Sequence, residues 1–184
     1  MTKAPLLLES PRLSYHKPRR QDAAAIFERY SGSAEATRFM AWPRHRTVDD
    51  TYAFIAYSDD EWRRWPAGPY LIRSRDGGTL LGSTGFAFET AERAITGYIL
   101  APDAWGQGYA TEAQRAMVEL APSLGIRVLT ASVHAGHLAS SRVLEKCGFA
   151  VEPGAPRRMV LPNLGDDAPA EVIEYCLRFP EGTA

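Results

Sequence analysis

Residues 95–111 read ITGYILAPDAWGQGYAT, the pattern of a strand, a loop with two glycines and the start of a helix. Gly106 and Gly108 allow the backbone to turn tightly and to approach a ligand with no Cβ in the way. Successive N–H groups in such a loop, together with the unpaired N–H groups of a helix start, attract anions. The stretch therefore predicts a strand–loop–helix unit that binds a diphosphate.

Two common phosphate-binding loops do not fit this stretch. A Walker A loop ends in Gly-Lys-Ser/Thr, but Gly108 is followed by Tyr109 and Ala110. A dinucleotide fingerprint needs a third glycine where this chain has Thr111, and an acidic residue after the next strand, which ends at His134 instead. A Gly-x-Gly loop alone is also compatible with a plain turn, so the surrounding sequence has to decide.

The sequence on both sides of this unit alternates between strand and helix patterns. Before it, we expect a strand, two helices and two further strands, at Leu13–His16, Ala23–Tyr30, Val48–Arg64, Tyr70–Ser74 and Thr79–Phe88. The last two strands and Ile95–Leu100 are joined by short turns, so they form an antiparallel meander. After it, we expect a strand, a helix and a final hairpin around the loop 163–167, at Val128–Val133, Leu138–Cys147, Arg157–Leu161 and Val172–Phe179. This order predicts a mixed α/β fold with helices packed on the faces of a sheet.

The composition is typical of one globular domain. The chain has 184 residues, 45% of them apolar and 23% charged, and no linker divides it, so we expect a single domain over residues 1–184. The 21 basic and 22 acidic residues nearly cancel, which gives no reason to expect nucleic acid or a membrane as partner. Cys147 and Cys176 lack metal-ligand spacing, so no metal is predicted. Neither a signal-peptide core nor a membrane span is predicted, and we expect a cytoplasmic protein.

Two longer segments resemble a known family. Gly97–Ala113 (GYILAPDAWGQGYATEA) resembles the acetyl-CoA motif of the GCN5-related N-acetyltransferases (GNAT), and Ser140–Phe149 (SSRVLEKCGF) is similar to a second segment of that family. The match is closest to the ribosomal-protein N-acetyltransferase (RimJ/RimL-like) subgroup. Members of that subgroup have Trp at the first position of the motif, where other family members have Gln or Arg, and Trp105 is similar to them in this. A third, weaker match is Leu7–Leu13 (LLESPRL). The resemblance extends over about residues 7–179, nearly the whole chain.

The resemblance implies a fold and a co-substrate. The fold would be the acyl-CoA N-acyltransferase fold, a mixed and mostly antiparallel sheet splayed between two strands, with helices on both faces. Acetyl-CoA would be the co-substrate, and the cleft would lie where Val128–Val133 parts from the preceding strand. The pyrophosphate would bind the loop, and the pantetheine arm would pair with the strand end, which assigns CoA binding to Trp105, Gly106, Gln107, Gly108, Tyr109, Ala110, Thr111, Ile99 and Leu100. Family members have Asn where this chain has His137, whose imidazole can still donate a hydrogen bond to CoA.

Acetyl transfer from acetyl-CoA to an amine requires that the amine is neutral. It also requires a hydrogen-bond donor to the carbonyl oxygen, a base that takes the proton of the amine and an acid that protonates the departing thiolate. An α-amine, with a pKa of about 7.7 to 8.0, is neutral more often at pH 7 than lysine, with a pKa of about 10.4. The resemblance gives Ser140 a catalytic contact to the CoA sulfur, although a serine is also common at a helix start. Tyr98 is a second catalytic candidate, with sheet packing as the alternative.

Glu89 is the predicted catalytic base, because it ends a meander strand where the cleft is expected to open. Glu92, His134 and His137 are alternatives, and each of these residues could instead be a solvated surface group. Glu112 follows the glycine loop and is expected to favour the start of the helix there.

The acceptor and part of the function stay open at this point. The acetyl acceptor is an amine on a small molecule or at a protein N-terminus, and the protein is a monomer or a homodimer. Seven residues in the N-terminal half either line an acceptor pocket or form the helix–sheet core: Arg38, Phe39, Trp42, Arg44, His45, Trp62 and Trp65. A catalytically weak CoA-binding sensor or scaffold is the alternative function, and a nucleotide-binding regulator is a third.

Overall fold

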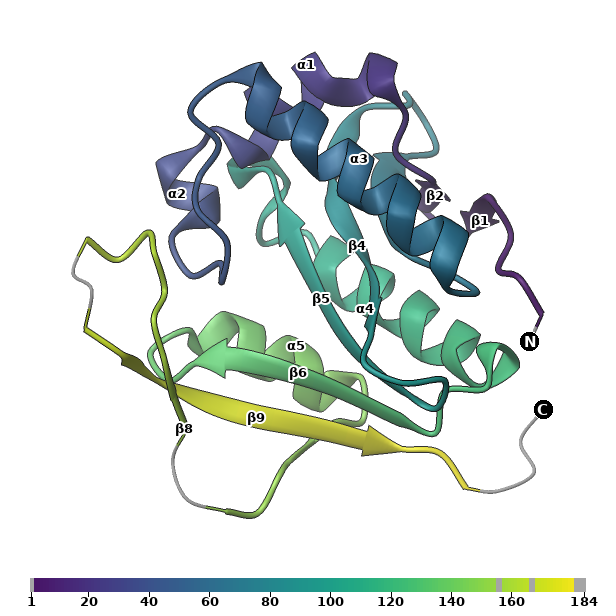
Figure 1. The fold of residues 1–184 in the computed structure, drawn as a ribbon, viewed down its shortest axis with the longest axis vertical. Coiled ribbons are helices and arrows are strands. Elements are labelled where there is room, and N and C mark those ends of the chain that lie inside the picture. The colour runs from purple at the N-terminus through teal and green to yellow at the C-terminus, as the bar shows by residue number, and fades with distance from the viewer. Residues whose placement is uncertain (1, 155–156, 166–167, 181–184) are drawn as a thin grey trace.

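The computed structural model describes residues 2–154, 157–165 and 168–180. In this part of the chain, the strands form a nine-stranded sheet in the order β1-β2-β3-β4-β5-β6-β9-β7, with β8 also paired to β9 (Figure 1). The strands are β1 Leu7–Glu9, β2 Leu13–His16, β3 Pro69–Ser74, β4 Leu80–Phe88, β5 Arg93–Leu100, β6 Val128–His134, β7 Ala150–Val151, β8 Arg157–Met159 and β9 Ala170–Arg178. All neighbouring strands are antiparallel except β5 and β6, which are parallel.

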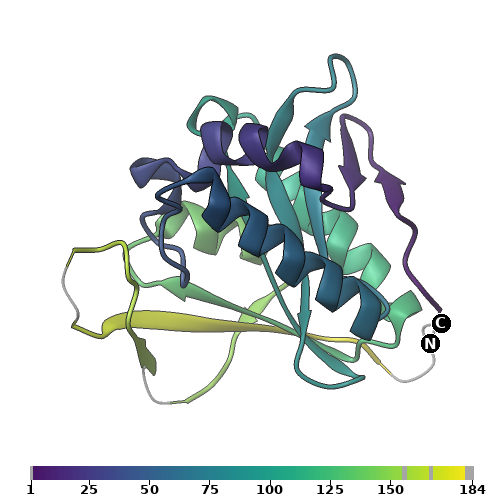
Figure 2. The ribbon, with the colours of Figure 1, turned by 45° about the horizontal axis from the view of Figure 1, so that its top comes forward.

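Helices cover both faces of this sheet (Figures 1 and 2). They are α1 Ala23–Ile26, α2 Ala34–Thr37, α3 Val48–Arg64, α4 Tyr109–Leu120 and α5 Leu138–Lys146. On one face, α1 and α3 bury Ile26 and Ile55 in a cluster with residues of the strands. On the other face, Met117 of α4 and Leu144 of α5 belong to the larger apolar cluster. No helix in the described ranges is long and apolar enough to cross a membrane.

The expected fold class is confirmed, and most elements lie within two residues of their expected bounds. The helix α3 begins at Val48 as expected, because Thr47 and Asp50 form a capping box there. The expected helix over residues 23–30 changes into a π-helical turn at Phe27–Ser31. Three short elements, β1, β7 and α2, were not expected. Residues 166 and 167 of the expected hairpin loop lie outside the described residues.

The sheet splits between β5 and β6. Their parallel pairing extends over three residue pairs, from Arg93 with Val128 to Ile95 with Thr130. Beyond Ile95, β5 remains paired to β4 up to Leu100, whereas β6 remains paired to β9 up to His134. The two strands therefore part along the second half of β5, as the family resemblance implied.

Candidate functional site

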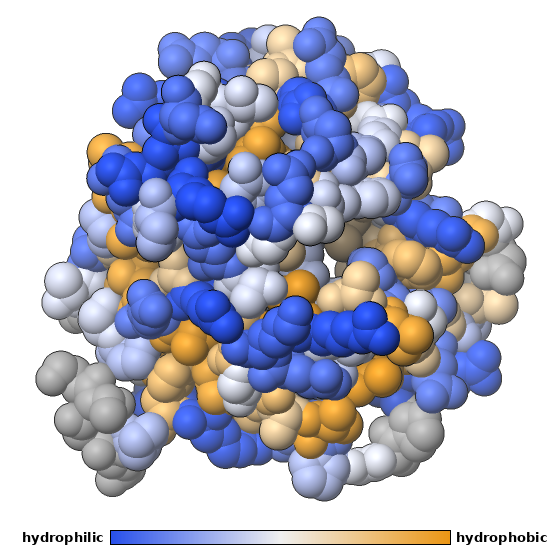
Figure 3. All heavy atoms as spheres, turned by 180° about the vertical axis from the view of Figure 1, so that it is seen from behind, coloured by the Kyte–Doolittle hydropathy of each residue, from blue (hydrophilic) through white to orange (hydrophobic). Residues whose placement is uncertain are grey.

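A cavity of about 970 Å³ lies where β5 and β6 part. Its walls come from both strands, from α5, from α3 and from the chain between α2 and α3. Seen from behind, the molecular surface is hollowed between its upper and lower parts (Figure 3). The cavity thus passes between the parted strands and connects the α4–α5 face of the sheet with the α3 face.

The predicted phosphate loop follows β5 at the start of α4, and none of its residues lines the cavity. Gly106 and Gly108 have φ angles of +73° and +79°, in the left-handed region that favours glycine. Among the described residues, the N–H groups of residues 106–111 have no acceptor in the protein. Consecutive amide donors at a helix start are an anion-binding arrangement, because the helix dipole adds positive potential there.

The side chains of the loop stabilise the loop itself. The Trp105 indole N–H donates to the Leu100 carbonyl at 3.0 Å, and the Gln107 amide donates to the Asp103 carbonyl at 2.9 Å. Asp103 in turn accepts two hydrogen bonds from Arg29, at 2.8 and 2.9 Å. Because these side chains bond back to the protein, the ligand-binding capacity of the loop lies mainly in its backbone amides.

The N-terminal segment holds the loop from the other side. Arg12 forms an ion pair with Glu112 at 2.7 Å and donates to the Gln107 carbonyl at 2.9 Å. Ser10 donates to the same carboxylate at 2.7 Å. Burial raises the pKa of Glu112, but the hydrogen bonds from Ser10 and Arg12 outweigh burial, so the pKa is lowered. Glu112 therefore does more than favour the helix start, and the sequence interpretation missed that Arg12 is its partner.

Two of the predicted catalytic residues meet in the cavity. The Tyr98 hydroxyl on β5 donates to Ser140 Oγ on α5 at 3.2 Å, and both residues line the cavity. Burial raises the pKa of Tyr98, and the hydrogen bond with Ser140 offsets only part of this rise. The phenol is therefore protonated at neutral pH and can donate a proton toward the serine.

Two histidines lie next to this pair. The Phe39 ring stacks on His134 and on His137, with centroid distances of 4.8 and 4.7 Å. Both histidines line the cavity. Burial and, to a lesser extent, the neighbouring His134 lower the pKa of His137, so its imidazole is neutral at pH 7 and able to accept a proton.

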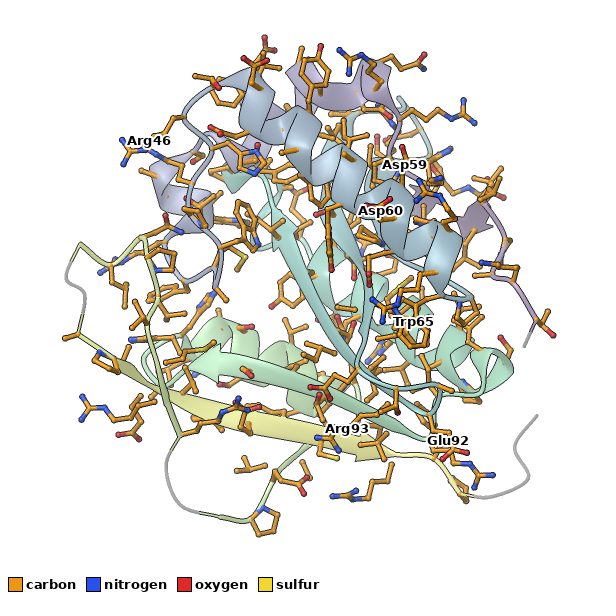
Figure 4. All side chains as sticks on the ribbon, in the orientation of Figure 1. Arg46, Asp59, Asp60, Trp65, Glu92 and Arg93 are labelled. Atoms are coloured by element: carbon orange, nitrogen blue, oxygen red, sulfur yellow. The ribbon has the colours of Figure 1, made fainter. Side chains whose placement is uncertain are left out.

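Glu89 does not lie near the other predicted catalytic residues. It forms an ion pair with Arg93 at 2.8 Å across the β4–β5 turn, and Glu92 forms one with Arg127 at 3.2 Å. At this end of β5 the strands are still paired, and neither glutamate lines the cavity. Figure 4 shows Glu92 and Arg93 at the opposite end of the molecule from Arg46. The expectation that the cleft opens at Glu89 is wrong, because the strands part toward Leu100.

The seven residues of the N-terminal half that were candidates for an acceptor pocket do not all line the cavity. Phe39, Trp42, Arg44 and His45 line the cavity. Trp62 packs edge-on against Tyr70 at 5.0 Å, Trp65 stacks on Phe88 at 5.3 Å, and neither tryptophan lines the cavity. Figure 4 shows Trp65 near the C-terminal end of α3. Arg38 lies with Phe39 and His134 at a second, smaller cavity of about 610 Å³. In the described ranges, no group of three or more His, Cys, Asp or Glu side chains is placed to hold a metal ion.

Comparisons with known proteins agree with this geometry. The family described as "Acetyltransferase (GNAT) domain" matches residues 12–150. The chain belongs to the GNAT family of acetyltransferases. It is 31% identical over 165 residues to "Uncharacterized N-acetyltransferase YoaA" of Bacillus subtilis (strain 168), which covers 85% of this chain and 89% of that protein. As a GNAT protein, it is an acyltransferase enzyme.

Solved structures of other GNAT proteins have the same fold. An acetyltransferase from Bacillus anthracis superposes with a TM-score of 0.78 at 19% identity, covering 94% of this chain and 98% of that chain. RimL, described as a ribosomal L7/L12 α-N-protein acetyltransferase in complex with coenzyme A, has a TM-score of 0.79 at 18% identity, with coverages of 94% and 97%. The microcin C7 self-immunity acetyltransferase MccE, in complex with acetyl-CoA and AMP, has a TM-score of 0.79 at 18% identity, with coverages of 92% and 94%. At such identities the likeness shows the fold alone.

Proposed function

We propose that this protein transfers the acetyl group of acetyl-CoA directly to an amine. The observation that carries the proposal is the row of unpaired backbone amides at residues 106–111. They follow β5, the strand whose Tyr98 lines the cavity and bonds to Ser140 there. Diphosphate oxygens match such amides in charge and in hydrogen bonding. The complexes of RimL with coenzyme A and of MccE with acetyl-CoA support the same co-substrate.

In this proposal, the loop and β5 bind the coenzyme. The amides of residues 106–111 hold the diphosphate, and the edge of β5 at Ile99 and Leu100, which faces no further strand, pairs with the pantetheine arm. The thioester then lies between the parted strands, close to Ser140. Trp105 supports a place for this chain in the RimJ/RimL-like subgroup.

The side chains in the cavity supply the proton transfers. The neutral amine attacks the thioester carbonyl, the new C–N bond forms and the C–S bond breaks. We assign the proton of the amine nitrogen to neutral His137, directly or through a water, and not to Glu89, which is ion-paired outside the cavity. The CoA thiolate takes a proton from Ser140 Oγ, which Tyr98 replenishes through its hydrogen bond. The proton held by His137 then returns through solvent to the Tyr98 oxygen, which restores both side chains for the next turnover. The thioester is already activated, so no covalent enzyme intermediate is needed.

Steady-state kinetics test this function. CoA release that depends on an added amine is expected, and Ser140→Ala should lower kcat by about 100-fold, the usual size of an acid–base contribution. Tyr98→Phe should lower kcat less, because Ser140 remains to contact the sulfur. Ser123→Ala is the matched control, since the Ser123 hydroxyl bonds only to the Leu120 carbonyl at the end of α4. An unchanged kcat in Ser140→Ala would remove that serine from the mechanism.

A non-catalytic CoA sensor is the second candidate, favoured by one observation. His137 occupies the position where the family resemblance places Asn, at the residue that precedes α5. Tight CoA binding in calorimetry without amine-dependent CoA release, over a broad set of amines, would support the sensor and contradict the transferase.

A further inference from the structure

We infer that the acetyl acceptor is a compact, apolar primary amine with a single amino group, and that polyamines and protein N-termini are poor substrates. This inference rests on the proposed transferase function and concerns the part of the cavity on the α3 face. We call that part the acceptor chamber and define it by Phe39, Met40, Trp42, Phe54 and Tyr57.

Apolar side chains dominate the acceptor chamber. Helix α3 presents Ala53, Phe54 and Tyr57 to it, at the spacing of one helix face. The chain between α2 and α3 adds Trp42, whose ring lies 5.3 Å from that of His45. Burying an apolar group of aromatic size against such walls removes apolar surface from water and favours binding.

The chamber offers little negative charge to an ammonium group. Among the described residues that line the whole cavity, the one carboxylate is Asp50. Asp50 Oδ2 already accepts from the N–H groups of Arg46 at 2.7 Å and Thr47 at 3.0 Å, and these bonds lower its pKa. The other charged side chains of the lining are arginines, Arg44 and Arg46. A polycation would lose its water shell in a cavity whose two arginines outnumber its one carboxylate, whereas a neutral amine carries no charge that needs a counter-charge.

One side chain fastens a wall of the chamber to the C-terminal hairpin. Asn163 Nδ2 donates to the carbonyls of Thr37 at 2.8 Å and Trp42 at 2.9 Å, and its Oδ1 accepts from the Arg44 N–H at 2.8 Å. The two carbonyls can only accept and the N–H can only donate, so the geometry fixes the orientation of the amide. Residues 37–44 are thereby fastened to the segment that follows β8, and we call this contact the Asn163 clasp.

The volume agrees with a small acceptor. The cavity of about 970 Å³ is at the upper end of the roughly 300–1,000 Å³ usual for small-molecule sites, and it has to hold the acetyl thioester as well. A peptide N-terminus would bring the polar groups of its backbone into this mostly apolar chamber, which costs free energy where they find no partner.

The test compares three acceptors by CoA release: phenethylamine, spermidine and a serine-initiated octapeptide. We expect kcat/KM for phenethylamine to exceed the other two values by about tenfold or more, the effect of burying an aromatic group. Trp42→Ala should raise KM for phenethylamine by about tenfold, with unchanged CoA affinity. Trp65→Ala is the matched control, because Trp65 stacks on Phe88 outside the cavity and should leave KM unchanged.

A second variant adds negative charge to the acceptor chamber. Tyr57 is 48% exposed, so Tyr57→Glu should fold and place a carboxylate at the chamber, shifting preference toward spermidine. A higher kcat/KM for spermidine or the octapeptide in the unmodified protein would overturn this inference and leave the transferase function intact. No CoA release with any amine, while acetyl-CoA still binds, would overturn the transferase function and this inference with it.

Discussion

Gly108→Ala tests whether the backbone of the glycine loop, and not its side chains, binds CoA. Gly108 has a φ of +79°, and an L residue in that region costs about 1 to 2 kcal/mol. The added Cβ would have room, because its nearest neighbour is Arg12 Nη2 at 3.5 Å. Gly108 and the preceding Gln107 are exposed, so the free protein can relax to a negative φ at this position.

The cost of Gly108→Ala should therefore appear in CoA binding. The ligand has to restore the left-handed conformation before the amides converge, and about 1 to 2 kcal/mol corresponds to about a 5- to 30-fold weaker Kd. The melting temperature should change little. Gln107→Ala removes only the side-chain hydrogen bond to the Asp103 carbonyl, so its effect on Kd should be smaller.

Gly125→Ala is the matched control for backbone strain. Gly125 has a φ of +83° at the end of the turn Ala121–Leu124, and the nearest atom to an added Cβ is the Ala91 carbonyl oxygen at 4.0 Å. Its neighbours Leu124 and Ile126 are each 1% exposed, so the strain cannot relax and should lower Tm by about 2 to 8 °C. Calorimetry with CoA and thermal unfolding measure both quantities. Equal CoA affinities in the two variants would refute the assignment of the loop amides.

Three other perturbations act on separate parts of the molecule. Arg12→Ala removes the hydrogen bond from Arg12 to the Gln107 carbonyl. CoA binding measured by calorimetry should weaken by about tenfold, because a hydrogen bond that involves a charged group contributes about that much. An unchanged Kd would contradict the role of Arg12 in supporting the loop. Asn163→Asp keeps the acceptor for Arg44 but cannot donate to the two carbonyls, so acceptor KM should rise while CoA affinity stays constant. Burial lowers the pKa of three histidines, His16, His45 and His137. Below about pH 6.5 the unfolded chain therefore binds more protons than the folded chain. The contribution of these histidines to the free energy of unfolding should be at its maximum above that pH and should be lost as the pH falls through the lowered pKa values. Urea unfolding should give a higher free energy of unfolding at pH 7.5 than at pH 5.5, and the opposite order would contradict this.

Elements with strong local signals could be predicted from the sequence. The helix α3 has a capping box, and the meander β3–β5 has short turns between apolar strands, so both were found within two residues. The strand β1 has three residues, β7 has two and α2 has four, so each is too short to show a periodic pattern. The π-helical turn at Phe27–Ser31 depends on how that segment packs, and the sequence pattern there is that of an ordinary helix.

Long-range contacts account for what the sequence did not predict at the site. The parting of β5 from β6 after Ile95 depends on pairing between segments more than 30 residues apart, which explains why Glu89 was placed at the wrong end of the cleft. The Asn163 clasp joins residues 119 to 126 positions apart. The Arg12–Glu112 pair spans 100 positions, and the weak N-terminal match was its one trace in the sequence. The Tyr98–Ser140 contact was anticipated only as two separate candidates.

Different elements support the glycine loop and the acceptor chamber, so CoA binding and acceptor binding can be changed separately. The glycine loop is held by the N-terminal segment through Arg12, whereas the acceptor chamber is held by the C-terminal hairpin through Asn163. No contact is shared between these two supports among the described residues. Distant sites without shared partners behave additively. The double variant of Arg12→Ala and Asn163→Asp should therefore combine the CoA defect of one with the acceptor defect of the other, and the free energies of the two effects should add.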